Sequence, residues 1–134
     1  MKEERAQRLI SRIEDAFRCV PRPRITKSVA RGFDDEWNLS EERVRELAAL
    51  DPEEDWQDVT ERDVIAFNEY FTFSDAEGWR FYLPAFMRHY LSNLEDPSGD
   101  AVYWACTSKD PKFDMLTPSQ LECVKEFLEI AHES

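Results

Sequence analysis

The chain has 134 residues, of which 42% are hydrophobic and 34% charged, and its formal net charge is −12. This length suits one domain, and so large an excess of acid argues against binding to nucleic-acid phosphates or to anionic membranes. The three cysteines have no paired spacing and no apolar signal segment opens the chain, which is typical of a protein of the cytoplasm.

Apolar residues recur at steps of three and four through the first third of the chain, which predicts helices. The first helix is expected over residues 3–20, stopped by Pro21. A second has apolar residues four apart from Ile25 to Trp37. A third begins at Ser40, because serine is a good N-cap and two glutamates follow it, where the helix dipole favours negative charge.

A fourth helix is expected from Thr60, and the longest and most buried helix follows it. Ser74 and Glu77 have the spacing of a capping box, and the apolar rhythm continues from there to Leu94. Pro84 lies inside this segment and removes one backbone hydrogen bond. The sequence therefore predicts a kink or a break in the central helix.

Residues 101–106 are ambiguous between a short helix and a buried strand, and a helix is favoured because no second strand is evident. Thr117, followed by Gln120 three residues later, predicts the start of the last helix. The expected fold is therefore all-α: a compact single-domain bundle of about six helices spanning the whole chain, with the long central helix kinked at Pro84.

Four segments, taken in order, resemble a known family. They are VPRP at 20–23, DWQD at 55–58, EGWRFYLPAF at 77–86 and LTP at 116–118. The set is similar to a family of small bacterial proteins catalogued as domain of unknown function 6714. The resemblance implies a helical bacterial protein without an established activity, and it carries over no catalytic residues.

Motifs for catalysis and metal binding are not evident in the sequence. The two histidines are isolated and the cysteines lie far apart, whereas zinc sites use such residues at close spacing. The acidic runs that begin at Asp51 and Asp96 lack the glycine and the bidentate glutamate of an EF-hand. Gly-rich phosphate loops and a nucleophile elbow are also missing. We expect no catalytic residue, no metal site and no cofactor.

The strongest functional candidate is the acidic stretch at residues 34–63, which carries thirteen Asp and Glu against three Arg, a net charge of −10. Within it we expect exposed aromatic anchors ringed by carboxylates, a combination that favours protein binding. The predicted contact residues are Asp34, Asp35, Glu36, Trp37, Glu53, Glu54, Asp55, Trp56 and Asp58. The alternative is a solvated acidic face with both tryptophans turned to the core.

These observations favour a non-catalytic interaction module that binds a basic protein, as an immunity protein or inhibitor binds a cationic toxin or enzyme. One alternative is an enzyme or small-molecule binder with a pocket near Pro84, whose polar groups are Arg80, Tyr82, Arg88 and His89. In that region Arg80 has a competing interpretation, an ion pair with Glu77 or with the acidic stretch. A subunit of a larger assembly is the third alternative.

Overall fold

The computed structural model describes residues 2–96, 100–109 and 111–132. These residues form seven α-helices and two short 3-10 helices, and no strand occurs among them. In chain order the elements are α1 (Lys2–Ala16), α2 (Lys27–Asp35), α3 (Glu41–Ala48), η1 (Trp56–Asp58), α4 (Glu61–Ala66), η2 (Tyr70–Phe73), α5 (Ala76–Ser92), α6 (Ala101–Thr107) and α7 (Pro118–His132). The all-α prediction is confirmed, and residues 101–106 belong to a helix.

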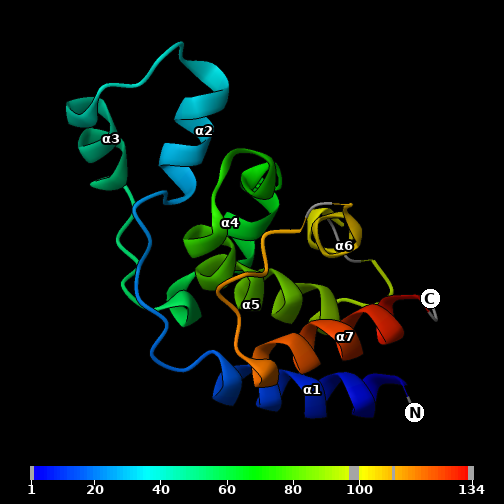
Figure 1. Ribbon diagram of the computed structural model, residues 1–134. Coiled ribbons are helices and arrows are strands. Elements are labelled where there is room, and N and C mark those ends of the chain that lie inside the picture. The colour runs from blue at the N-terminus through cyan, green and yellow to red at the C-terminus, as the bar shows by residue number, and fades with distance from the viewer. Residues whose placement is uncertain (1, 97–99, 110, 133–134) are drawn as a thin grey trace.

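The helices form a packed body from which one hairpin projects (Figure 1). α1 and α7 lie side by side along one edge of the body, and α5 packs against α1. α6 contacts α5 and α7, while η1 and α4 cover another part of α5. The hairpin consists of α2 and α3, and it extends from the end of the body opposite the start of α1 and the end of α7.

α5 is the central helix, as predicted, because most of its side chains are buried on all sides. Phe81, Leu83 and Met87 are completely inaccessible to solvent. The helix runs without interruption through Pro84, so the predicted break does not occur. The kink expected at the same residue stays a prediction.

The N-terminus of α5 differs by one residue from the sequence prediction. Asp75 is the N-cap, and its carboxylate accepts a hydrogen bond of 2.9 Å from the Gly78 amide. Ser74, the predicted cap, instead donates its hydroxyl proton to the hydroxyl of Tyr70 at 2.7 Å. The predicted capping box of Ser74 with Glu77 is wrong because a buried tyrosine takes the serine hydroxyl.

The other predicted N-caps are confirmed. The Ser40 hydroxyl accepts from the amide of Arg43 at the start of α3, and a reciprocal capping box opens α4 at Thr60. At the start of α7, the Thr117 hydroxyl accepts from the amide of Gln120, whose side-chain oxygen accepts from the Thr117 amide. Polar side chains close to their backbone partners in sequence satisfy these free amides.

The end of α1 lies four residues before the predicted end at residue 20. The side-chain amide of Gln120 donates to the carbonyl of Ala16 at 2.9 Å, and the indole of Trp56 donates to the carbonyl of Phe17 at the same distance. Cys19 then has a φ of 63°, the left-handed conformation that ends many helices. Side chains from distant segments therefore satisfy the last carbonyls of α1.

Gly78 is closely packed against the buried hydroxyl groups of Ser74 and Tyr70. A methyl group on this residue would lie 2.0 Å from the Ser74 hydroxyl oxygen and 2.1 Å from the Tyr70 hydroxyl oxygen, both of which are buried. Gly78→Ala is therefore expected to lower the free energy of unfolding by about 1–3 kcal/mol, although alanine favours helix over glycine by about 1 kcal/mol. Urea denaturation measures the change.

Gly32→Ala is the matched control, because it also places alanine inside a helix. Its new methyl group would meet Leu47 Cδ1 at 2.5 Å, the far end of a flexible side chain that can rotate away. The cost at Gly32 is therefore expected to be smaller than at Gly78. Equal losses at the two glycines would contradict the role assigned to the Tyr70 and Ser74 contact.

Candidate functional site: the acidic tip and the buried ion cluster

The structure divides the acidic stretch at 34–63 into an outer part and an inner part. Asp51, Glu53 and Trp56 are buried, with exposed fractions of 4%, 2% and 1%. The expectation that Glu53 and Trp56 lie on the outer surface is wrong. The other predicted contact residues are accessible to solvent. Glu36 is half-buried, and the remaining ones are exposed: Asp34, Asp35, Trp37, Glu54, Asp55 and Asp58.

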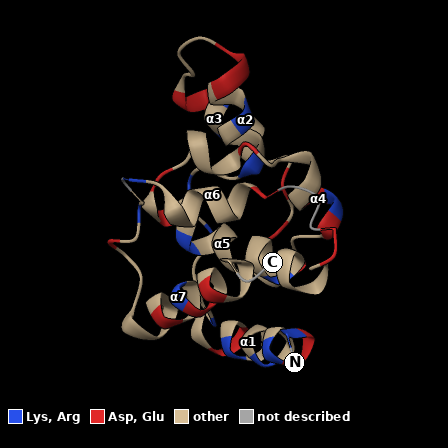
Figure 2. Cartoon of the chain, turned by 90° about the vertical axis from the view of Figure 1, so that its right-hand side faces the viewer, with Lys and Arg blue, Asp and Glu red and all other residues tan. Residues whose placement is uncertain are grey.

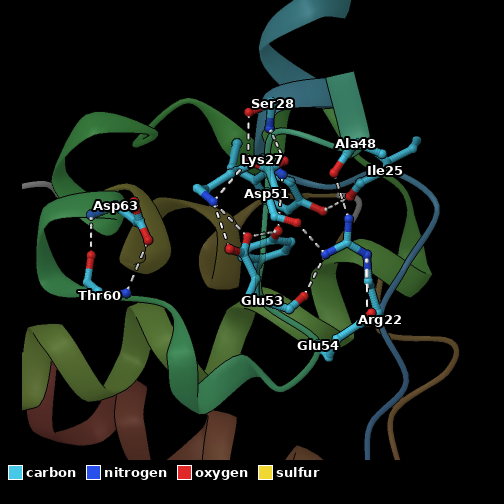
Figure 3. A network of polar contacts seen from close by, with 12 residues as sticks. Arg22, Ile25, Lys27, Ser28, Ala48, Asp51, Glu53, Glu54, Thr60 and Asp63 are labelled. Atoms are coloured by element: carbon cyan, nitrogen blue, oxygen red, sulfur yellow. Dashed lines mark hydrogen bonds and ion pairs between the residues drawn. The ribbon is translucent and has the colours of Figure 1, made fainter. Parts of the chain in front are cut away.

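The inner part forms a buried ion cluster, made of Lys27, Asp51, Glu53 and Tyr82. Figure 3 shows Lys27, Asp51 and Glu53 lying together. The Lys27 ammonium lies 2.8 Å from both carboxylate oxygens of Glu53 and 3.0 Å from Oδ1 of Asp51. The Tyr82 hydroxyl donates to Glu53 Oε2 at 2.8 Å and accepts from the Lys27 backbone amide at 3.1 Å. Every charged group in the cluster thus has an oppositely charged partner, which a buried charge requires.

Further bonds tie the cluster to the base of the hairpin. Ser28 donates to the Asp51 carboxylate from its amide at 2.9 Å and from its hydroxyl at 2.7 Å. The Arg22 guanidinium donates to the backbone carbonyls of Ala48, Asp51 and Glu53 at 2.6–2.8 Å (Figure 3). The first turn of α2, the end of α3 and the segment after it are thereby joined to α5 of the body.

The pKa shifts of the cluster residues agree with this arrangement of charges. Burial by itself would lower the pKa of Lys27, but hydrogen bonds to Glu53 and Asp51 raise it above its ordinary value. Burial would likewise raise the pKa of Asp51, yet donors at the start of α2, Ser28 and Lys27 among them, hold it below its ordinary value. Burial and the nearby Glu53 charge raise the pKa of Tyr82. Lys27 and Asp51 are charged, and Tyr82 stays protonated, at neutral pH.

The cluster has a structural role rather than an open site. All four members are buried, and none of them lines any of four surface pockets found in the described part of the chain. Its contacts fix how the α2–α3 hairpin leaves the body. The pattern that points to it in the sequence is Lys27, a lysine set between the apolar Ile25 and Val29.

The outer part is the acidic tip, which we define as residues 34–42 at the far end of the hairpin. It holds five Asp and Glu and no Lys or Arg, and Figure 2 shows acidic residues gathered there. Trp37 lies just beyond the C-cap of α2 and is 97% exposed. Asn38 follows with a φ of 59°, so a residue that tolerates the left-handed region turns the chain toward α3.

An arginine of α3 holds this turn in place. Arg43 donates from Nε and from its terminal nitrogen to the Glu36 carboxylate, at 3.0 and 2.8 Å. The hydrogen bond from Arg43 lowers the pKa of Glu36. Glu36, a predicted contact residue, is therefore already engaged within the chain, whereas the Trp37 indole remains open to solvent.

The structure brings together only two of the four residues predicted to form a pocket near Pro84. Arg88 and His89 line a surface pocket of about 350 Å³ beside α4. In it, Nδ1 of His89 lies 3.2 Å from Oε2 of Glu61. Tyr82 belongs to the buried ion cluster instead. Arg80 lines none of the four pockets, and its Nε atom has no hydrogen-bond partner among the described residues.

The expected ion pair of Arg80 with Glu77 or with the acidic stretch does not form among the residues that the structure describes. In the same part of the chain, no three His, Cys, Asp or Glu side chains are grouped so that they could hold a metal ion. Nor does any helix in these ranges have the length and apolarity to cross a bilayer.

Fold and surface together define a small all-α protein with a projecting acidic hairpin. The chain belongs to a family of unknown function, DUF6714, whose model matches residues 5–134. This match confirms the resemblance drawn from the sequence segments. Comparison with curated proteins and with solved structures yields no match.

Proposed function

We propose that the chain is a non-catalytic interaction module that binds a basic protein through its acidic tip, as an immunity protein or inhibitor does. One observation carries the proposal: Trp37 is 97% exposed at the end of a hairpin, in a segment that has five carboxylates and no cation. A tryptophan in this position makes little apolar contact with the rest of its own chain. Burial against a partner would remove a large apolar area from water.

Charge and rigidity support the same function. The exposed carboxylates of Asp34, Asp35 and Glu42 would attract a cationic surface and speed its approach at low salt. The Glu36 to Arg43 pair and the buried ion cluster hold the tip before any partner arrives, which reduces the entropy lost on binding. The proposal also places the chain in the cytoplasm, where the buried thiols of Cys106 and Cys123 would stay reduced.

The predicted contact surface is correspondingly narrower than the whole stretch at 34–63. Trp37, Asp34 and Asp35 form its centre, and the exposed Glu54, Asp55 and Asp58 near η1 are available to a larger partner. Glu53 and Trp56 take no part, since they are buried. The alternative of an enzyme built from Arg80, Tyr82, Arg88 and His89 is less favoured, because these residues do not share one pocket.

The proposal predicts that a single change at Trp37 strongly weakens partner binding. The immobilised chain is incubated at low salt with an extract of its source cells, and captured proteins are identified by mass spectrometry. We expect a basic protein whose binding weakens with added salt. Trp37→Ala is expected to weaken its binding at least about 30-fold, the effect of losing an aromatic hot spot.

A matched pair of double variants separates local from general charge effects. Asp34→Asn with Asp35→Asn removes two charges at the tip, whereas Glu3→Gln with Glu4→Gln removes two from the exposed first turn of α1. Only the tip pair is expected to slow association. Equal effects of the two pairs, or a captured protein that still binds Trp37→Ala normally, would refute the acidic tip as the binding surface.

A further inference from the structure

A second feature of the surface is a pocket of about 350 Å³ between η2, the start of α5 and α6. Its lining includes Phe71 of η2, Trp79 of α5 and Trp104 of α6. Ala101 and Ala105, one turn apart on α6, also line it, and their side chains are small. The volume is at the small end of the range for ligand pockets.

The charge around this pocket is unusual for so acidic a chain. Three other surface pockets are each lined by at least two Asp or Glu side chains, whereas none of the described residues that line this one is acidic. It contains instead the ammonium of Lys112, which lies 5.3 Å from the centroid of the Trp79 ring. Within the described ranges the Lys112 ammonium contacts the Trp79 ring and forms no ion pair.

The aromatic walls are held in fixed orientations. The Trp79 indole donates to the carbonyl of Phe71 at 3.0 Å, and the two rings meet edge to face at 5.3 Å. The Trp104 indole donates to the Asp100 carboxylate at 3.0 Å, although 61% of this residue remains exposed. A planar ligand would therefore meet a preformed surface and would lose little entropy by ordering it.

We infer that this pocket binds a small planar aromatic molecule that carries a carboxylate. Its ring packs against the exposed Trp104 indole and the edge of the Phe71 and Trp79 pair. Its carboxylate accepts a charge-assisted hydrogen bond from the Lys112 ammonium. The pocket is separate from the acidic tip, so this binding does not depend on the proposed protein partner.

A heteronuclear NMR titration of the isotopically labelled full chain with naphthoate tests the inference. The four tryptophans provide four indole N–H signals, which Trp→Phe variants assign. We expect the signals of Trp79 and Trp104 to move and those of Trp37 and Trp56 to stay, with a Kd of about 1 mM or tighter, as suits a ligand of this size. Naphthamide, which lacks the charge, and cyclohexanecarboxylate, which lacks the aromatic ring, are expected to bind more weakly.

Two variants test the assigned contacts. Lys112→Gln is expected to weaken naphthoate binding about tenfold and to leave naphthamide unchanged, because one charge-assisted hydrogen bond is lost. Lys125→Gln removes the same charge from an exposed position on α7 and is expected to have no effect. Ala101→Leu, which fills the pocket, is expected to prevent binding of both probes while circular dichroism remains that of the folded chain.

Three results would overturn the inference. They are indole signals of Trp79 and Trp104 that do not move up to the solubility limit of naphthoate, shifts centred on Trp37 or Trp56, and equal losses from Lys112→Gln and Lys125→Gln. Trp37→Ala is expected to bind naphthoate normally, so a loss of partner binding and a loss of ligand binding can be told apart.

Discussion

Lys27→Met is expected to lower the free energy of unfolding by about 3–5 kcal/mol, because it leaves two buried carboxylates without their cation. In the folded chain the Lys27 ammonium lies within 3.0 Å of both Asp51 and Glu53, and all three side chains are almost inaccessible to solvent. Because methionine fills a similar volume, the loss of unfolding free energy measures the effect of the missing charge rather than of poorer packing. Urea denaturation at neutral pH measures it.

An exposed ion pair of similar length provides the control. Arg24 and Glu41 are 2.7 Å apart, but their side chains are 49% and 74% exposed. Arg24→Met is therefore expected to change the free energy of unfolding by no more than about 1 kcal/mol. If Lys27→Met costs as little as Arg24→Met, the cluster does not hold the hairpin.

The pH dependence of the difference between wild type and Lys27→Met checks the same mechanism. The depressed pKa of Asp51 means that its contribution is present above its ordinary value of 3.8 and is lost as the pH falls through its lower folded-state value. The raised pKa of Lys27 means that its contribution is complete below 10.5 and is lost as the pH rises through its higher folded-state value. The difference should thus be largest between those limits and shrink on both sides.

Trp56→Ala is expected to be as damaging, with a loss of about 3–5 kcal/mol in the free energy of unfolding. The indole is 1% exposed, donates to the Phe17 carbonyl and lies beneath the Arg88 guanidinium, 4.9 Å from its central carbon. Removing it leaves a cavity and an unsatisfied carbonyl at the end of α1. Thermal and urea denaturation measure the loss.

Trp37→Ala is the comparison that the sequence suggests, since both tryptophans lie in the same acidic stretch. Because Trp37 is 97% exposed, its removal is expected to change the free energy of unfolding by no more than about 0.5 kcal/mol. Trp56→Phe, which removes chiefly the indole donor, should cost about 1–3 kcal/mol. Similar losses for Trp37→Ala and Trp56→Ala would contradict their placement on the surface and in the core.

The sequence by itself determined the features that depend on neighbours along the chain. The helical rhythm placed most of the helices, and Ser40, Thr60 and Thr117 marked three of their starts, because an N-cap side chain bonds to an amide two or three residues away. The central position of α5 followed from its continuous apolar rhythm. The concentration of acid at residues 34–63 was equally plain from composition.

Only the tertiary structure decided which members of the acidic stretch face water. Glu53 and Glu54 are adjacent acids with the same local signals, yet the first bonds to Lys27, 26 residues earlier, and the second is exposed. Trp56 is buried where the Phe17 carbonyl, 39 residues away, accepts its indole proton, whereas the Trp37 indole has no hydrogen-bond partner among the described residues. A buried charge or donor is stable only beside a matching group, and that group is set by how distant segments pack.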